Sequence, residues 1–506
     1  MTTTEDTIEE TTGENSISRR SFAGLILGAG ATVALGALAG CSPKSLAEAK
    51  EVPTVVGDYD LVIVGSGGAG MAAGVSAHDS GARVAILEKM PVAGGNTCFA
   101  EGGMNVCNTK YQAAEGIEDS VELFVADTYK GGRNRGDKDL ITYMCAHSNE
   151  ALEWLGEKGI VLSRLGRSGG ASVPRIHRPE SGEAVGKYIV RGMTAQCAQR
   201  GIAPICNTNV QEILFEGGRV NGVRALDPEG NNVVYRAKAV IIASGGFGAN
   251  HPMLAQYRPE LLEAVTTNQP GSQGDGIRMA SAIGADLVDI DQIQVHPTVE
   301  QGTATLLSEG IRGDGAILVN TNGLRFTNEL LTRDVVSAIE WEQPGRGSWA
   351  VFDQKVYDAN TSIKEKFVKR NIIQTADTLE LLADRMGLAG SAKESFLATV
   401  HSYNEDIAAG EPDEFGRSAS LEPIEDAPYY AVAVAPGIHH CMGGIRINAD
   451  AQVLDVAGEP LAGLFAAGEV TGGVHGGNRI GGNAICDIHV YGLRAGRSAL
   501  SYIGLA

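Results

Sequence analysis

Residues 60–70 read DLVIVGSGGAG and are the strongest indication of the fold in this chain. The first five residues are mostly apolar, as expected for a buried parallel strand. Three glycines follow with the spacing Gly-x-Gly-x-x-Gly, and an alanine-rich helical pattern continues to about Ser80. A second apolar run, residues 83–87, ends at Glu88. This order of strand, glycines, helix, strand and acidic residue predicts a Rossmann-like dinucleotide-binding unit.

Five residues of this unit have expected contacts with a dinucleotide. Gly65 and Gly67 let the backbone approach a pyrophosphate closely, because they carry no side chain. Ala69 and Gly70 open the helix, whose free N–H groups and dipole favour an anion. Glu88 is expected to accept hydrogen bonds from ribose hydroxyls.

Residues 468–484, GEVTGGVHGGNRIGGNA, form a second unusual stretch near the C-terminus. Glycine at this density means that the backbone approaches another group closely, or turns where a side chain would clash. Arg479 is the one arginine of the stretch and is suited to bind an anion through two parallel hydrogen bonds. The two ends of the chain are therefore expected to enclose a dinucleotide cofactor, with an anionic substrate against it.

The composition is that of an ordinary globular protein, with 506 residues of which 43% are hydrophobic. This length suggests two to three domains. The formal net charge of −20 argues against a nucleic-acid partner. The acidic surface is expected to be solvated, or to steer a basic redox partner.

The N-terminus carries targeting signals. Residues 18–22, SRRSF, match a twin-arginine motif, residues 23–40 are rich in Ala, Gly and Leu, and residues 38–41, LAGC, read as a lipobox. Five glycines weaken the apolar stretch, which disfavours the alternative of a membrane-spanning helix. We expect residues 1–40 to be a Tat lipoprotein signal peptide, Cys41 to carry the lipid and residues 41–57 to be a tether. The protein would then be exported and held on the outer face of the cytoplasmic membrane or in the periplasm.

The other seven cysteines form no Cys-x-x-Cys pair, which argues against a c-type haem on this chain. No spacing suggests an iron–sulfur cluster or a zinc site, so no metal is expected. A redox reaction here would need a separate electron donor, for which a cytochrome or a quinol dehydrogenase is the expected partner.

Further motifs are more specific than those of a general nucleotide-binding site. They are GGNT at residues 94–97, GGMN at 102–105, VIIASGG at 240–246, TNQPG at 267–271 and GDG at 274–276. With them the chain resembles the flavoprotein subunits of fumarate reductases and succinate dehydrogenases, and is closest to the soluble, exported fumarate reductases. The resemblance runs from about residue 58 to residue 499.

The resemblance implies FAD and an α/β fold. A discontinuous Rossmann-like FAD-binding domain, residues 58–290 and 441–506, would carry an inserted α+β capping or clamp domain, residues 291–440. The cofactor contacts implied in addition to the first unit are Asn96, Thr97, Gly102, Gly103, Asp275, Glu469, Ala484 and Ile485. Asn96 stands where membrane-bound members of the family attach FAD covalently to a histidine, which implies non-covalent FAD here.

The same resemblance implies reduction of a carbon–carbon double bond conjugated to a carboxylate. Such a reaction needs a hydride from flavin N5, a proton donor, and cationic groups that polarise the carboxylate. Arg333 would donate the proton and be re-protonated through Glu309 and Arg312. The substrate contacts implied are His439 and Arg479 on one carboxylate, His296, Ser308 and Glu309 on the other, and Gly482.

Some of these assignments have alternatives from the residues alone. A guanidinium pKa exceeds about 12, so chemistry alone would nominate a histidine as the proton donor. Glu309, Arg312 and Arg333 could also form a purely structural ion-pair network. His440 and His475 are expected to be structural.

Fumarate is the favoured substrate, because both His439 and Arg479 are present for a second carboxylate. Ser308, Cys441, Gln269 and Leu306 depart from the residues usual in fumarate reductases, which leaves urocanate, itaconate or a cinnamate-type acid as alternatives. A ketosteroid dehydrogenase shares the fold family, but uses tyrosines near the flavin. A non-catalytic flavin-bearing lipoprotein is the remaining alternative.

Overall fold

The computed structural model describes residues 53–360, 363–410, 412–417 and 422–505. The twin-arginine motif, the lipobox and Cys41 lie outside the described residues. From Glu51 onward the chain forms one compact unit. Residues 54–57, which the sequence assigns to the tether, belong to the first strand because they pair with a neighbouring strand of the main sheet.

The main sheet has seven strands in the order β17-β18-β7-β8-β1-β2, with β6 paired to β7. The strands are β1 (Thr54–Val64), β2 (Val84–Leu87), β6 (Asn209–Glu216), β7 (Arg219–Leu226), β8 (Asn232–Ile242), β17 (Gln452–Leu454) and β18 (Pro460–Ala466). β1 is parallel to β2 and to β8, as the nucleotide-binding motif predicts. The apolar residues at 61–64 are buried, which explains why this segment has no alternating polar pattern.

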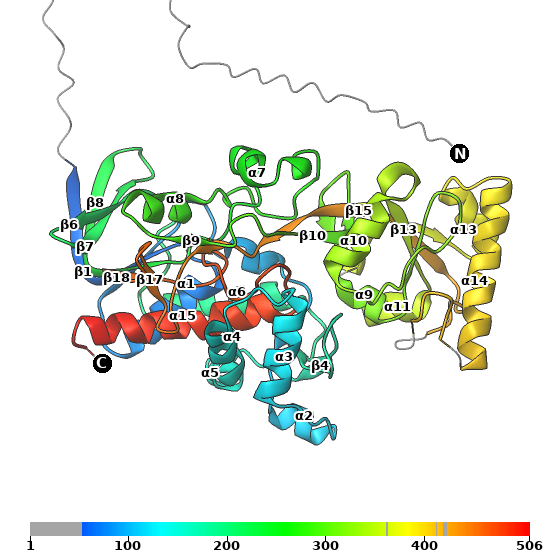
Figure 1. The fold of residues 1–506 in the computed structure, drawn as a ribbon, viewed down its shortest axis with the longest axis horizontal. Helices are drawn as coiled ribbons and strands as arrows, with labels where there is room; N and C mark the ends of the chain where they lie inside the picture. Colours follow the sequence, from blue (N-terminus) through cyan, green and yellow to red (C-terminus); the bar gives the residue numbers. More distant parts are fainter. Residues whose placement is uncertain (1–52, 361–362, 411, 418–421, 506) are drawn as a thin grey trace, which may run out of the picture. The chain divides into compact units, whose positions relative to one another are not determined.

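The two ends of the chain meet on β8. Val240 of β8 lies opposite Val62 of β1 on one side and Leu464 of β18 on the other. Helix α15 (Asn483–Tyr502) packs against α1 (Gly68–Asp79), as Figure 1 shows in red and blue. This packing is close because a methyl group at Gly492 would lie 2.7 Å from the carbonyl oxygen of Ala69. The sheet is thus built from segments almost 400 residues apart.

A second sheet is inserted between these segments. Its order is β11-β10-β15-β13-β12, with β14 paired to β15. The strands are β10 (Ile293–Glu300), β11 (Thr305–Leu306), β12 (Ile317–Val319), β13 (Ser348–Phe352), β14 (Gln374–Ala376) and β15 (Tyr429–Cys441). The associated helices are α9 (Glu309–Gly313), α10 (Arg333–Trp341), η3 (Pro344–Arg346), α11 (Gln354–Ala359), η4 (Lys364–Val368), α13 (Leu379–Arg385) and α14 (Ser391–Ala409). Two hydrophobic clusters of its own stabilise this region.

The chain passes from the main sheet to the inserted sheet, and back, near the predicted domain boundaries. β10 begins at Ile293 and β15 ends at Cys441, close to the predicted limits of 291 and 440. Figure 1 shows β10 and β15 running from the side of the main sheet toward α9, α10 and β13. The domain limits themselves stay a prediction.

The remaining elements surround the main sheet. They are η1 (Gly95–Phe99), β3 (Met104–Asn105), α2 (Lys110–Ala114), α3 (Val121–Gly131), α4 (Lys138–Ala146), α5 (Ser148–Glu157), β4 (Arg164–Gly166), β5 (Ile176–Arg178), α6 (Val185–Gln199), α7 (His251–Tyr257), η2 (Pro259–Leu261), α8 (Asp275–Ala282), β9 (Leu287–Val288) and β16 (Gly444–Ile445). Among the described residues, none of the helices has the length and apolar character needed to span a membrane.

Candidate functional site

A cavity of about 610 Å³ runs from the glycines of the first motif to the inserted sheet. At its nucleotide end, Gly65 has a φ of 105°, and a methyl group there would lie 2.4 Å from the carbonyl oxygen of Ala243. Gly67 and Ala69 line the cavity, but Gly70 does not. A methyl group at Gly70 would lie 2.0 Å from the carbonyl oxygen of Gly65, so this glycine allows α1 to start directly against the turn.

The start of α1 has the properties of an anion site. Its N-cap residue, Gly67, has no side chain that could cap it, and the first turn contains no acidic residue. Helix N-termini of this kind bind phosphate through free N–H groups. The Gly68 N–H donates to Thr97 Oγ1 over 3.0 Å, which links this end to the GGNT motif.

Glu88 lies at the same end and is buried. Its Oε2 accepts hydrogen bonds from the N–H of Ser66 (3.0 Å) and from Ser66 Oγ (2.7 Å), and its Oε1 accepts one from the N–H of Met90 (2.8 Å). A carboxylate has about four acceptor positions, so ribose hydroxyls can still donate to it. The hydrogen bonds hold Glu88 in place at the cavity wall.

The middle of the cavity is lined by Asn96 and Glu469. Asn96 Nδ2 donates to Asn268 Oδ1 (2.6 Å) and to Glu469 Oε2 (3.0 Å), while Asn96 Oδ1 accepts from the N–H of Gln269 (2.9 Å). An amide nitrogen is not a nucleophile, so Asn96 fits a cofactor that is not covalently attached. Burial raises the pKa of Glu469, whose oxygen atoms accept hydrogen bonds from Asn96 and from the N–H of Cys441.

The other predicted cofactor residues also reach this cavity. Asp275 lies in the first turn of α8 and pairs with Lys89 and Arg278. The lining includes Thr97, Gly102, Gly103, Asp275, Ala484 and Ile485. Residues from four separate segments therefore meet around one elongated space.

The far end of the cavity brings the predicted substrate residues together. His296 lies on β10 and His439 on the neighbouring strand β15, with ring centroids 5.2 Å apart. Ser308 caps α9, and Arg333 is the first residue of α10. The lining at this end includes His296, Ser308, Glu309, Arg333, His439, Arg479 and Gly482.

Arg333 is held by two partners. Its Nε donates to Glu309 Oε2 over 2.7 Å, and its Nη1 donates to Gln294 Oε1 over 3.0 Å. Gln294 Nε2 in turn donates to the carbonyl oxygen of Arg479 over 2.7 Å. Gln294 thus connects the two arginines, a role that sequence reasoning missed although Gln294 precedes His296 by only two residues in β10.

The electrostatics of this end favour an anion. Burial, together with the charge of Arg333, holds the pKa of His296 and of His439 well below the usual value, so both rings are neutral near pH 7. Burial and the nearby charge of Arg333 lower the pKa of Arg479 to about 9. Among the described residues, His296 Nε2 and Arg479 Nε have no hydrogen-bond partner. Buried polar atoms of this kind normally bond to a ligand or to water.

Arg312 lies behind this end of the cavity, not in its wall. It is buried, and its Nη1 donates to the carbonyl oxygen of Glu329 over 2.5 Å. The charges of Arg333 and Arg312 outweigh the effect of burial and hold the pKa of Glu309 below its usual value. Glu309 is therefore ionised between two guanidinium groups.

The two histidines expected to be structural differ in position. His440 lines the cavity, with Nδ1 3.5 Å from Glu469 Oε1. His475 is buried outside the cavity wall and lies 3.3 Å from Asp487 Oδ2. His440 is thus a pocket residue, whereas His475 supports the glycine-rich loop.

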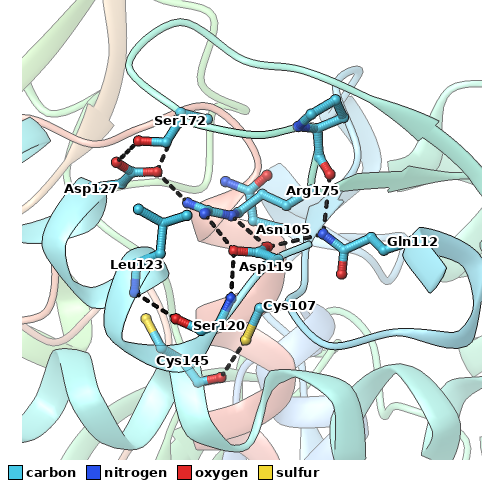
Figure 2. Close-up of polar contacts among 12 residues, drawn as sticks. Asn105, Cys107, Gln112, Asp119, Ser120, Leu123, Asp127, Cys145, Ser172 and Arg175 are labelled. Atoms are coloured by element: carbon cyan, nitrogen blue, oxygen red, sulfur yellow. Dashed lines mark hydrogen bonds and ion pairs between the residues drawn. The ribbon is translucent and has the colours of Figure 1, made fainter. Parts of the chain in front are cut away.

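A buried ion-pair network that the sequence analysis did not predict supports the loop beside Glu309. Arg175 pairs with Asp119 (2.8 Å) and with Asp127 (2.6 Å), as Figure 2 shows. Asp127 also accepts a hydrogen bond from the N–H of Ser172 over 2.8 Å. The same loop presents the N–H of Gly169 to Glu309 Oε1 over 3.1 Å. These charges lie far apart in the sequence, so only the fold brings them together.

A dinucleotide cradle, a central pocket and a cationic end share one cavity, which is suited to hold a dinucleotide cofactor beside an anion. The FAD binding domain family matches residues 60–485, and the chain belongs to this family. It is 46% identical over 442 residues to the NADH:fumarate oxidoreductase of Klebsiella pneumoniae, an alignment that covers 87% of this chain and 47% of that protein. It is 41% identical over 444 residues to a fumarate reductase (cytochrome) of Shewanella frigidimarina, covering 88% and 77% of the two chains.

The fold is shared with a solved relative. The open conformation of a flavocytochrome c3 fumarate reductase superposes with a TM-score of 0.75 at 40% identity, covering 89% of this chain and 79% of that chain. The chain spans about half the length of the Klebsiella relative. The comparisons confirm the predicted α/β fold, the family and FAD as the cofactor.

Proposed function

We propose that this chain is an FAD-dependent reductase of a carbon–carbon double bond conjugated to a carboxylate, and that its reaction is fumarate to succinate. The observation that carries this proposal is the cationic end of the cavity, where Arg333, Glu309 and Arg479 meet His296 and His439. The similarity to proteins named fumarate reductases supports it.

Different residues at the cationic end of the cavity bind the substrate and transfer the proton. Arg479 and His439 hold one carboxylate of the substrate, while His296 and Ser308 donate to the other, so that charge can spread into it. FAD supplies the hydride when bound. Arg333 donates the proton to the second carbon, and the carboxylate of Glu309, 2.7 Å from its Nε, accepts a proton from Arg312 and passes it to Arg333. Arg312 lies behind Glu309 and is the next group of this path.

The four departures from the usual fumarate reductase residues act in different places. Leu306 and Ser308 line the cavity beside the substrate residues. Cys441 is buried, and its Sγ accepts a hydrogen bond from the N–H of Phe247 over 3.4 Å. Gln269 uses its Oε1 to accept from the N–H of Gly271 over 2.8 Å. Gln269 lines the cavity as well, so three of the four positions lie where they can affect the choice of acid.

The test is a panel of unsaturated acids. FAD-loaded protein is supplied with electrons from a reduced viologen dye and offered fumarate, urocanate, itaconate and cinnamate. We expect fumarate to have the highest kcat/KM by about tenfold, which corresponds to about 1.4 kcal/mol of transition-state preference. If a monoacid has the highest value, the roles given to His439 and Arg479 are wrong.

The cellular location and the partner are part of the same proposal. The twin-arginine motif and the lipobox support export and a lipid on Cys41, which would hold the enzyme on the outer face of the membrane. A separate cytochrome or quinol dehydrogenase would supply the electrons, as the similarity to a fumarate reductase (cytochrome) supports. Fractionation of a Cys41→Ala variant tests the anchor, because the protein should leave the membrane fraction.

A further inference from the structure

Three arginines line the cavity without a role in the reaction described so far: Arg167, Arg178 and Arg370. They come from three separate segments, the loop after β4, the end of β5 and the turn after η4. In the part of the chain that the structure describes, none of the three forms an ion pair with a carboxylate. Each is bonded only to neutral oxygen atoms.

The hydrogen bonds of the three arginines go to neutral oxygen atoms, and carboxylates act on them only through space, Asp314 and Glu309 on Arg178 and Glu300 on Arg370. Arg167 donates to the carbonyl oxygens of Ala171 (3.0 Å) and Ser172 (2.8 Å). Arg178 Nε donates to the carbonyl oxygen of Gly102 over 2.7 Å, and Arg370 donates to Thr305 Oγ1. Protein cations that line a cavity normally have an anionic partner, so an anion is expected to pass or to bind here.

The positions of these arginines point to the substrate end and not to the nucleotide end. A methyl group at Gly310 would lie 3.1 Å from Arg178 Nη2 and 3.4 Å from Ser308 Oγ, so this guanidinium lies beside a predicted substrate contact. Arg370 bonds to β11, the strand that leads to Ser308.

The three arginines differ in their exposure to solvent. Arg167 and Arg370 are exposed to solvent, whereas Arg178 is half-buried, and burial lowers its pKa. Lys366 also lines the cavity but is paired with Glu101, so it adds little net charge. Arginines without a direct carboxylate partner thus lead from the surface to Ser308.

The chain has a net charge of −20, which would repel an approaching dianion at long range. At about 0.1 M salt the Debye length is only about 10 Å, so local charges dominate once the dianion is near the cavity. Clefts lined by one sign of charge focus the field and can raise association rates by about 10- to 1,000-fold. A local cationic entrance would therefore offset the acidic surface.

We propose that Arg167, Arg178 and Arg370 form a cationic entrance through which a dicarboxylate reaches Arg333 and Arg479. This inference rests on the proposed function for the class of substrate. Arg167 and Arg370 capture the dianion at the surface, and Arg178 passes it to Ser308. The residues add nothing to the chemical step.

The test measures association of malonate with the oxidised, FAD-loaded enzyme by stopped flow, followed by flavin absorbance. Malonate is a dianion with a single carbon between its carboxylates, so it cannot be dehydrogenated to an alkene. The variant is Arg167→Gln combined with Arg370→Gln, two exposed positions whose replacement leaves the core intact. The matched control is Arg219→Gln combined with Arg236→Gln, which removes the same charge from exposed positions of β7 and β8 outside the cavity lining.

We expect the entrance variant to associate with malonate about tenfold more slowly than the wild type at low salt. The difference should vanish at about 1 M salt, where the Debye length is about 3 Å. The control variant should match the wild type. Equal association rates for the entrance variant and the wild type at low salt would overturn the proposal, as would an equal loss in the control.

The two proposals fail in different ways. If the wild type reduces fumarate but the entrance variant binds malonate at the wild-type rate, only the entrance is wrong. If the wild type binds malonate in the arginine-dependent manner but reduces no fumarate, the entrance stands and the proposed reaction is wrong. A wild type that does not bind malonate at all contradicts both.

Discussion

The contacts of Arg333 bear on its proposed role as the proton donor. Its Nε donates to Glu309, which the neighbouring guanidinium charges keep ionised, and its Nη1 donates to Gln294. The histidines that chemistry alone would nominate as acids are neutral near pH 7, because burial lowers the pKa of His296 and His439. A neutral imidazole with a low pKa is a poor source of protons at that pH, which supports the proposal that Arg333 is the donor.

Replacing Arg333 tests this assignment. Arg333→Gln should reduce kcat by at least about 100-fold, because general acid catalysis contributes about 10²–10⁴. FAD content, measured by the flavin absorbance of the purified variant, should be unchanged since Arg333 lies at the substrate end. A variant with nearly the wild-type kcat would show that the proton comes from another group.

At the scale of elements, the close contact between β1, α1 and α15 positions the nucleotide cradle. Glycines occupy the points of contact, and the methyl group of any other residue at Gly70 would lie 2.0 Å from a backbone oxygen. A backbone atom cannot move aside as a flexible side chain can. The start of α1 would therefore shift away from the turn that holds the pyrophosphate.

The prediction for this contact concerns Gly70→Ala. We expect loss of most bound FAD and a decrease of about 1–3 kcal/mol in the free energy of unfolding, the usual range for overpacking. Flavin absorbance and urea unfolding measure the two effects. Gly156→Ala is the matched control, because a methyl group there would contact nothing within 4 Å and alanine favours the helix. Full FAD content in Gly70→Ala would contradict the role of this glycine.

For the whole molecule, two buried histidines contribute to the dependence of stability on pH. Burial lowers the pKa of His177 and of His489 to about 4, against about 6.5 for an unfolded chain. Below pH 6.5 the unfolded chain binds protons that the folded protein does not. Stability is therefore lost as the pH falls from about 6.5 to about 4, and is fully present above that window.

Each of these two histidines should contribute up to about 3 kcal/mol of this loss. Thermal unfolding between pH 7.5 and 4.5 measures the slope, which should decrease in His489→Gln. The control is His401→Gln, because His401 is exposed on α14. A melting temperature that stays constant between pH 7 and pH 5 would contradict the prediction.

The sequence by itself determined the nucleotide-binding unit, because that unit is local. Residues 60–88 contain the strand, the glycines, the helix, the second strand and the acidic residue in one continuous segment, and each follows from short-range rules of backbone conformation and apolar pattern. The resemblance also placed the substrate residues, from His296 to Arg479, in motifs that the structure brings to one cavity.

Only the tertiary structure decided how these parts act on one another. Gln294 between the two arginines, the Arg175 network with Asp119 and Asp127, and the three arginines of the entrance all depend on contacts between distant segments. No local pattern encodes such contacts, because they arise when packing brings separate elements together. The charge states follow for the same reason: burial sets the pKa of a histidine or an arginine, and burial is a property of the folded chain.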